Sequence, residues 1–147
     1  MSYEQLKLEN QICFPIYALS RLITVEYQPF LEKLELTYPQ YLVMMILWEQ
    51  DNVSVSFIGK KLILNTNTLT PLLKRMETLK LLERVRSKKD ERKVFIKLTS
   101  KGKELEKEAS NIPFELINSI NCKEINLDKM KEIKENLNIL INHINNK

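Results

Sequence analysis

The sequence of 147 residues contains little of several residue types on which particular protein classes depend. Only two glycines and five prolines are present, which excludes a disordered or fibrous chain and argues against a strand-rich sandwich with many turns. The single histidine, His143, permits neither a zinc-type constellation nor a Ser-His-Asp set, and there is no Gly-rich phosphate loop. The longest apolar run, residues 41–48, is far shorter than the roughly 20 residues that span a bilayer. We therefore expect a largely helical protein without a cofactor or metal.

The N-terminus has neither the basic segment nor the apolar segment of a signal peptide, so we expect a cytoplasmic protein. In that compartment the two cysteines, Cys13 and Cys122, are expected to be reduced thiols rather than a structural disulfide. A chain of this length can bury a sizeable core without such a crosslink.

Positive charge is concentrated in the middle of the chain. Residues 1–52 carry a net charge of −4 and residues 103–147 carry −1, whereas residues 53–102 carry thirteen lysines and arginines against four acids, a net +9. A mixed, solvated surface would not separate charge in this way. The block predicts a surface for a polyanion, most often nucleic acid. The alternative is a basic surface without a partner.

Apolar residues with helical spacing predict a first helix over about residues 10–34. Pro15 fits the first turn if this helix begins near residues 11–13 and kinks the helix if it begins earlier. Pro29 is expected to kink the helix or to end its regular part. Thr37 and Gln40 match a capping box at the start of a second helix. That helix is apolar nearly all round and should be buried.

The middle of the chain has the pattern of a winged helix. A short helix after Ser54 and a longer one over about residues 65–79 are close enough together to form a helix-turn-helix. The pattern then changes to period two in residues 82–86 and 94–98, which predicts a β-hairpin with a charged tip. We expect a mainly α fold with a small β-hairpin wing.

Two further helices are expected after the hairpin. Thr99 caps one, which Pro113 interrupts, and Asn126 caps the last. The helices at the two ends of the chain carry more apolar surface than the winged helix alone could cover, so a homodimer built from both ends is expected. The predicted organisation is a single unit, 1–147, with dimerisation helices at about 1–36 and 103–147 and the DNA-binding winged helix at about 37–102.

The second helix of the helix-turn-helix and the hairpin carry the candidate DNA contacts. Short polar side chains at the start of that helix could reach phosphates or base edges. Cations along the hairpin would lie against the neighbouring backbone, and an arginine at its tip suits a narrow minor groove. The alternative is a capped helix and a solvated hairpin. The candidates are Thr66, Asn67, Thr68, Thr70, Lys74, Arg75, Arg84, Arg86, Lys88, Lys89 and Arg92.

Cys13 lies near the predicted start of the first helix, where the helix dipole favours a thiolate, the form that peroxides oxidise. The phenols of Tyr17, Tyr27 and Tyr38 could hydrogen-bond such a thiolate. Tyr27 is fourteen residues from Cys13, about 21 Å along a continuous helix, so these two could meet only across an antiparallel dimer interface. Cys122 could resolve a sulfenic acid formed at Cys13. The alternatives are an inert buried cysteine at 13 and a bystander at 122.

With these residues in view, the sequence resembles the MarR family of winged-helix regulators, and within it the organic-hydroperoxide-resistance repressors. A cysteine in the first helix followed by Leu-Thr-Tyr-Pro-Gln-Tyr is the specific combination, whereas the Asp-x-Arg motif of the wing indicates only the wider family. The similarity runs from Leu6 to Pro113 and is carried by Lys7-Leu-Glu-Asn-Gln-Ile-Cys13-Phe, Leu36-Thr-Tyr-Pro-Gln-Tyr-Leu42, Leu47-Trp-Glu49, Thr68-Leu-Thr-Pro-Leu-Leu-Lys-Arg-Met-Glu77 and Arg86-Ser-Lys-Lys-Asp-Glu-Arg92.

The resemblance implies a homodimeric repressor that binds a pseudo-palindromic operator in double-stranded DNA. Organic hydroperoxide would oxidise the cysteine that matches Cys13 and so release the protein. Tyrosines matching Tyr17, Tyr27 and Tyr38 would hold the thiolate, with bonds that reach across the dimer. In two-cysteine members a second thiol near the position of Cys122 links to the first across subunits, and one-cysteine members form a mixed disulfide with a low-molecular-weight thiol.

In the wing, the resemblance implies that Asp90 braces the loop and that Arg92 enters the minor groove. Three positions depart from the usual pattern of the family. Pro15 replaces an ordinary apolar residue beside the cysteine. Asn65-Thr66-Asn67 replaces Asp-Ser-Gly, which would change operator preference. Lys88-Lys89 replaces residues that are more often acidic, which should raise salt-sensitive affinity.

Other functions fit parts of the sequence. A regulator of the same family could be released by a small aromatic ligand in the dimer crevice, with Cys13 incidental. A thiol peroxidase could turn over at Cys13, but Ile12, Phe14 and Pro15 are apolar where dedicated peroxidases place Thr and Arg. A dimerisation module that binds no DNA would leave the basic middle segment unexplained. The sequence therefore predicts a regulator and not an enzyme.

Overall fold

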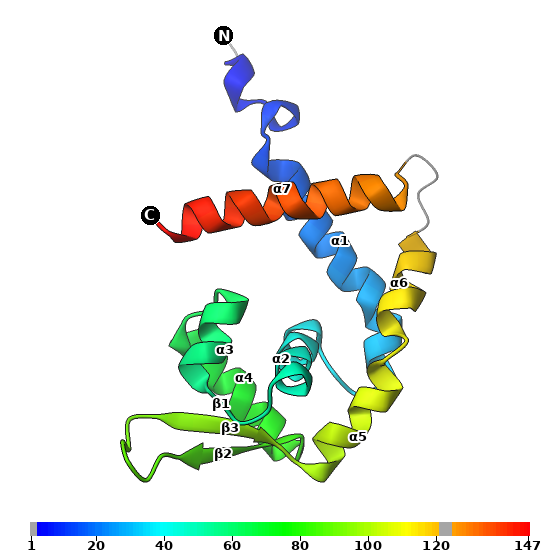
Figure 1. The fold of residues 1–147 in the computed structure, drawn as a ribbon. Helices are drawn as coiled ribbons and strands as arrows, with labels where there is room; N and C mark the ends of the chain where they lie inside the picture. The colour runs from blue at the N-terminus through cyan, green and yellow to red at the C-terminus, as the bar shows by residue number, and fades with distance from the viewer. Residues whose placement is uncertain (1–2, 121–124) are drawn as a thin grey trace. The chain divides into compact units, whose positions relative to one another are not determined.

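A computed structural model describes residues 3–120 and 125–147 (Figure 1). The chain divides into two compact units after Leu116. The first unit contains the winged helix and its hydrophobic core, and the second contains the C-terminal helical segment. No helix in the described part of the chain combines the length and the apolar character needed to cross a membrane.

The first helix, α1, covers Cys13–Glu32 and follows two short 3-10 turns, Glu4–Leu6 and Leu8–Asn10. Pro15 is its third residue, so the missing N–H of the proline falls in the first turn, the outcome expected for a helix that begins near residues 11–13. Of the two outcomes expected for Pro29, a kink or an end of the regular helix, the second is wrong, because α1 continues to Glu32. The last turn is held by burial of its apolar residue Leu31, which is 2% exposed.

The second helix, α2, covers Tyr38–Glu49 and lies in the centre of the core of the first unit. At its start the Thr37 N–H donates to the side-chain oxygen of Gln40 at 2.8 Å, a bond of the predicted capping box. Val43, Met44 and Leu47 are almost completely buried. The prediction of a buried helix is therefore confirmed.

The helix-turn-helix consists of α3, Val55–Leu62, and α4, Thr66–Thr78. Ser54 caps α3 by accepting from the Phe57 N–H, and Asn65 caps α4. Gly59 permits the tight connection between them, because a Cβ there would lie 3.0 Å from the Leu64 carbonyl oxygen. Both helices lie where the sequence predicted them, after Ser54 and from about residue 65.

The sheet has three antiparallel strands in the order β1-β3-β2: β1 at Val53–Ser54, β2 at Leu82–Arg86 and β3 at Val94–Leu98. Strands β2 and β3 form the predicted hairpin (Figure 1). In it, Leu82 lies opposite Leu98 and Arg84 lies opposite Ile96. The sequence did not reveal β1, because two residues are too few to show a period.

Three helices follow the sheet: α5 at Ser100–Ala109, α6 at Ile112–Ile120 and α7 at Leu127–Asn145. The predicted caps are present, since Thr99 accepts from the Gly102 N–H at 3.1 Å and Asn126 accepts from the Lys129 N–H at 3.0 Å. The sequence did not predict α6 as a separate helix. Pro113, expected only to interrupt α5, lies in the first turn of α6, where a proline is tolerated.

Candidate DNA-binding and redox-sensing sites

The outward face of α4 presents the short polar residues predicted to contact DNA. Thr66 and Asn67 are exposed in the first turn. The hydroxyl of Thr68 donates to the Asn65 side chain at 3.1 Å, so this residue also supports the helix cap. Thr70 is half-buried, and Lys74 and Arg75 are exposed further along. The opposite face of α4 is anchored in the core by Leu69, Leu73 and Met76, which are at most 1% exposed.

The tip of the wing is a hydrogen-bonded loop between Ser87 and Lys93. The Ser87 N–H donates to the Lys93 carbonyl, and the Lys93 N–H donates to the Asp90 carbonyl, both at 2.9 Å. A carboxylate oxygen of Asp90 accepts from the Arg92 N–H at 3.1 Å, while the Ser87 hydroxyl accepts from the N–H groups of Lys89 and Asp90. Asp90 therefore shapes the loop that carries Arg92. Arg86, Lys88, Lys89 and Arg92 are all exposed.

Arg84 differs from the other cations of the wing. It lies on the face of the hairpin that also carries the buried Leu82, Ile96 and Leu98, and its side chain is only 23% exposed. Its Nη1 lies 3.8 Å from a carboxylate oxygen of Glu77 in the last turn of α4. The structure thus gives this predicted DNA contact a partner inside the protein.

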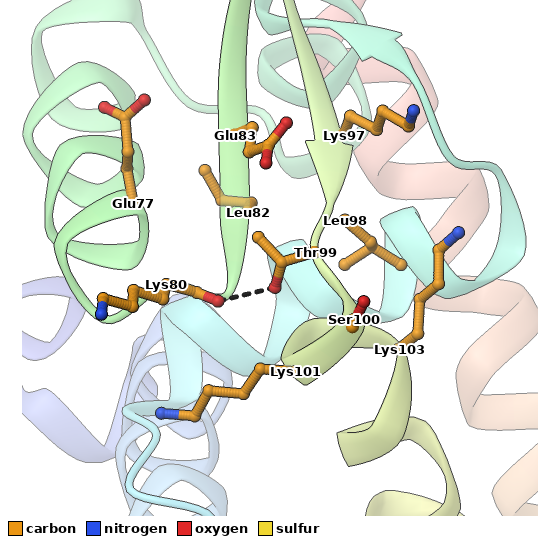
Figure 2. Close-up of a pocket in the computed structure, with 10 residues that line it drawn as sticks. All are labelled: Glu77, Lys80, Leu82, Glu83, Lys97, Leu98, Thr99, Ser100, Lys101 and Lys103. Atoms are coloured by element: carbon orange, nitrogen blue, oxygen red, sulfur yellow. Dashed lines mark hydrogen bonds between the residues drawn. The ribbon is translucent and has the colours of Figure 1, made fainter.

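An open pocket of about 650 Å³ lies at the base of the wing, between the end of α4, the hairpin and the start of α5 (Figure 2). Lys80, Lys97, Lys101 and Lys103 are among its lining residues. Their ammonium groups point toward opposite sides of the pocket instead of converging (Figure 2). Lys103 also lies 3.8 Å from Asp51. The pocket therefore presents a cationic rim and no closed anion site.

Cys13 is the first residue of α1 and is exposed. Tyr17 follows it by one helical turn and is 59% exposed, with the Arg21 guanidinium 5.8 Å from its ring centroid. Because α1 is continuous from residue 13 to residue 32, Tyr27 lies about 21 Å from Cys13 along the same helix. The two therefore do not meet within one chain. Cys122, the predicted resolving cysteine, lies outside the described residues.

Two of the three predicted phenols form an aromatic cluster. The rings of Tyr27 and Tyr38 lie 4.8 Å apart, and Tyr41 lies 5.8 Å from Tyr27. Burial, with the neighbouring Tyr38 and Tyr41, raises the pKa of Tyr27 to about 12. Burial also raises the pKa of Tyr38. Both phenols are therefore protonated at neutral pH and can donate a hydrogen bond. Tyr41 was missed because its place in an apolar run suggested only core packing.

Each unit exposes apolar side chains on its helices. In the first unit, α1 exposes Ile16, Leu19, Leu22 and Val25. In the second, no residue of α7 is buried, and the exposed apolar residues of this helix are Leu127, Met130, Ile133, Ile139, Leu140, Ile141 and Ile144. Many exposed apolar side chains on one helix are typical of helices that pack against another chain. Within residues 3–120 and 125–147, no three His, Cys, Asp or Glu side chains gather closely enough to hold a metal ion.

Comparison with known proteins places this architecture in a family. Residues 26–109 match the family described as "Transcriptional regulator SarA/Rot". The organic hydroperoxide resistance transcriptional regulator of Bacillus subtilis is 50% identical over 111 residues, which cover 76% of each chain. The HTH-type transcriptional regulator MgrA of Staphylococcus aureus is 37% identical over 139 residues, which cover 94% of this chain and 92% of MgrA.

A solved structure, that of reduced AbfR bound to DNA, matches with a TM-score of 0.78 and 39% identity over 98% of this chain and 99% of AbfR. AbfR of Staphylococcus epidermidis has also been solved in an overoxidized form bound to DNA and in a disulfide form. The family match covers more than half of the chain, and the relatives match along most of it. The chain is therefore a MarR-type winged-helix transcriptional regulator that belongs to the SarA/Rot family.

Proposed function

We propose that this protein is a homodimeric repressor that binds a pseudo-palindromic operator and leaves it when organic hydroperoxide oxidises Cys13. The observation that carries the proposal is the exposed thiol at the first residue of α1, in a chain half identical to an organic hydroperoxide resistance regulator over three quarters of its length. We place its action in the cytoplasm. In this proposal the winged helix, about residues 37–102, binds DNA, and the terminal segments, about 1–36 and 103–147, dimerise.

DNA binding rests on two neighbouring surfaces of the winged helix. The first turn of α4 supplies exposed polar groups at a helix N-terminus, suited to a major groove. The loop held by Asp90 supplies Arg92 for a minor groove, flanked by Lys88 and Lys89. Both surfaces are cationic or polar, and α4 is anchored in the core by its buried face. The winged helix can therefore present the two surfaces to the same duplex.

The proposed oxidation balances as a two-electron step at sulfur. The Cys13 thiolate attacks the terminal oxygen of the hydroperoxide, so that an S–O bond forms as the O–O bond breaks. The alkoxide that leaves takes a proton and becomes an alcohol. Cys13 becomes a sulfenic acid. A second thiol then attacks this sulfur and displaces water, forming a disulfide. We propose that this thiol is Cys122 of the other subunit or a low-molecular-weight thiol.

We propose that Tyr17, one turn from Cys13, and the Tyr27–Tyr38 pair of the opposite subunit hold the thiolate before oxidation. Protonated phenols can donate to a thiolate, and a disulfide removes that acceptor. Reduced and overoxidized AbfR have both been solved bound to DNA. For this chain we therefore propose the disulfide, and not further oxidation of Cys13, as the step that releases DNA.

The decisive experiment uses a duplex that the reduced wild-type protein selects from a random-sequence pool. Cys13→Ser is expected to bind this duplex with wild-type affinity and to remain bound when equimolar cumene hydroperoxide releases the wild type. Cys122→Ser is the matched cysteine control. If Cys122 resolves, its loss abolishes the dimer-sized band of the oxidised protein in non-reducing electrophoresis. Release of Cys13→Ser by the peroxide would refute sensing through Cys13.

We propose that Cys13 reacts once per oxidation and does not turn over as a peroxidase, because its neighbours Ile12 and Phe14 offer no polar group to stabilise a leaving alkoxide. A peroxide consumption assay with excess dithiothreitol and the reduced protein is expected to show no sustained turnover above the Cys13→Ser background. Continuous consumption proportional to protein concentration would favour the enzyme instead.

A second candidate is a regulator released by a small aromatic ligand. An open, largely apolar pocket of about 340 Å³ lies between α2 and the region where α5 ends, with Tyr41, Met45, Trp48, Ala109 and Pro113 among its lining residues. Titration of the duplex complex of Cys13→Ser with salicylate, in the presence of reductant, separates the two candidates. Release under these conditions would support the ligand-responsive regulator.

A further inference from the structure

The carboxylate of Glu77 holds Arg84 at two points. One oxygen accepts from the backbone N–H of Arg84 at 3.2 Å, and the other lies 3.8 Å from Nη1 of the same residue. Glu77 is in the last turn of α4 and Arg84 is in the middle of β2, so these contacts join the end of the recognition helix to the wing. Figure 2 shows the Glu77 side chain on α4 beside the strand that carries Leu82 and Glu83.

The backbone contact has a structural reason. In the order β1-β3-β2, strand β2 is at the edge of the sheet, and alternate N–H groups of an edge strand point away from its only neighbour. Arg84 contributes such an N–H, which Glu77 accepts. Without this bond, β2 would still be joined to the helix-turn-helix by the connection 79–81, by its buried apolar side chains and, through β3 and β1, by the sheet, but its outward N–H would lose its direct contact with α4.

The side chain of Arg84 is largely buried against the protein, with 23% of it exposed. Its Nε is buried and has no hydrogen-bond partner among the described residues, although a buried donor ordinarily finds one. Two residues further along the same strand, Arg86 is exposed. A guanidinium that serves only to meet phosphate would gain from exposure like that of Arg86. The enclosed position of Arg84 instead pairs its charge with Glu77.

We infer that Glu77 and Arg84 form an internal clamp that sets the wing at a fixed position relative to α4, so that Arg84 acts in DNA binding as a positioning residue and not as a DNA contact. This inference rests on the proposed DNA-binding function. Its consequence is specific: the two grooves of the duplex are read together only while the clamp holds the wing tip and the start of α4 in register.

For one substitution, Glu77→Gln, the clamp and a direct DNA contact by Arg84 predict opposite changes in DNA affinity. Glu77→Gln removes a negative charge from a protein that binds a polyanion, so electrostatics alone predicts equal or tighter binding. The clamp predicts weaker binding, by roughly fivefold, because the glutamine oxygen can still accept from the Arg84 N–H but the ion pair that holds the guanidinium is lost. Glu83→Gln is the matched control, since Glu83 is exposed, also lies on β2 and makes no ion pair within the described residues.

The test measures binding of Glu77→Gln, Arg84→Met, the double variant and Glu83→Gln to the duplex selected by the wild type, at several salt concentrations. The clamp predicts that each single substitution at 77 or 84 weakens binding, that the double variant is no weaker than the poorer single variant, and that the slope of log affinity against log salt stays at the wild-type value. If the slope for Arg84→Met is less steep than that of the wild type by about two, one counterion for each subunit, Arg84 contacts a DNA phosphate directly.

Further measurements distinguish loss of folding from loss of DNA binding, and failure of the clamp from failure of the proposed function. Thermal unfolding of each variant confirms that the protein is folded at the assay temperature, and assays are run below the lowest midpoint. Binding of Glu77→Gln equal to or tighter than that of the wild type overturns the clamp, whereas the proposed function stands. Failure of the wild type to select any duplex, or a flat salt dependence of its binding, overturns the proposed DNA-binding function itself.

Discussion

The number of exposed cations on α4 and the wing sets an upper limit to the salt dependence of DNA affinity. Six of the candidate DNA contacts on α4 and the wing are exposed cations in each subunit: Lys74, Arg75, Arg86, Lys88, Lys89 and Arg92. If all twelve in a dimer displaced counterions, log affinity would fall with log salt with a slope of about −11, which is the upper limit. A surface that makes no phosphate contacts would give a slope near zero.

Arg92→Ala tests one of these cations with little change to the loop. The bond from the Arg92 N–H to Asp90 uses the backbone, so it survives loss of the side chain. We expect the slope to become less steep by about 1.8, which is 0.9 for each of the two subunits, and the affinity at fixed salt to fall at least about tenfold. Fluorescence anisotropy with a labelled duplex between 50 and 300 mM KCl, roughly the range over which such slopes are resolved, measures both quantities.

Lys107→Ala is the control, because Lys107 is an exposed cation on α5 outside the two proposed DNA-binding surfaces. It should leave the slope and the affinity at their wild-type values. An unchanged slope for Arg92→Ala would refute the placement of the wing tip on DNA. An equal effect of Lys107→Ala would show that net charge, and not the wing, determines binding.

Three further predictions concern the fold and the tyrosine cluster. Gly102→Ala should lower the free energy of unfolding by about 2 kcal/mol or more, because its Cβ would collide with the Leu81 carbonyl; a urea unfolding midpoint equal to that of the wild type would contradict this packing. Leu73→Ala should cost about 2–5 kcal/mol in the same assay, because Leu73 is fully buried, whereas Leu79→Ala, at a site 38% exposed, should cost much less. The pKa of Tyr27 is raised to about 12 in the folded protein, so its unfolded form loses a proton first and stability should fall as the pH rises from about 10 toward 12. Tyr27→Phe should reduce this alkaline loss, and an ultraviolet pH titration in which Tyr27 ionises near its ordinary value would exclude the buried cluster.

Local signals in the sequence were sufficient for most elements of the fold. Thr99 and Asn126 were predicted as helix caps, and helices were predicted after Ser54 and from about residue 65. In the structure the side chains of Ser54, Asn65, Thr99 and Asn126 each accept a backbone N–H. Caps are readable because the bond spans only two or three residues. The period-two pattern of the hairpin is readable for the same reason, since each strand alternates between a buried and a solvated face.

Features that depend on contacts between distant segments were not readable. Strand β1 exists only because Val53 and Ser54 pair with Ile96 and Phe95, more than forty residues away. The continuation of α1 through Pro29 depends on burial of the last turn, which overrides a local preference. In both cases the deciding energy comes from tertiary packing.

The candidate sites divide in the same way. Charge segregation and the Asp-x-Arg motif identified the wing cations from sequence, because charge and turn chemistry are properties of residue types. The sequence could not show that Arg84 and Arg86 have different roles, since they lie two residues apart on the same face of one strand and carry the same charge. Burial and the contact with Glu77 distinguish them in the fold.

The sequence by itself determined where the helices begin, where the chain turns into a hairpin, and which third of it is cationic, because these properties follow from neighbours a few residues apart. Only the tertiary structure decided which cations face solvent, which phenols touch, and which carboxylate supports the edge strand. These are outcomes of packing, in which a side chain is enclosed or exposed by segments far away in the chain. The Tyr27–Tyr38 contact across eleven residues of sequence and the Glu77–Arg84 clamp are the two examples most relevant to function.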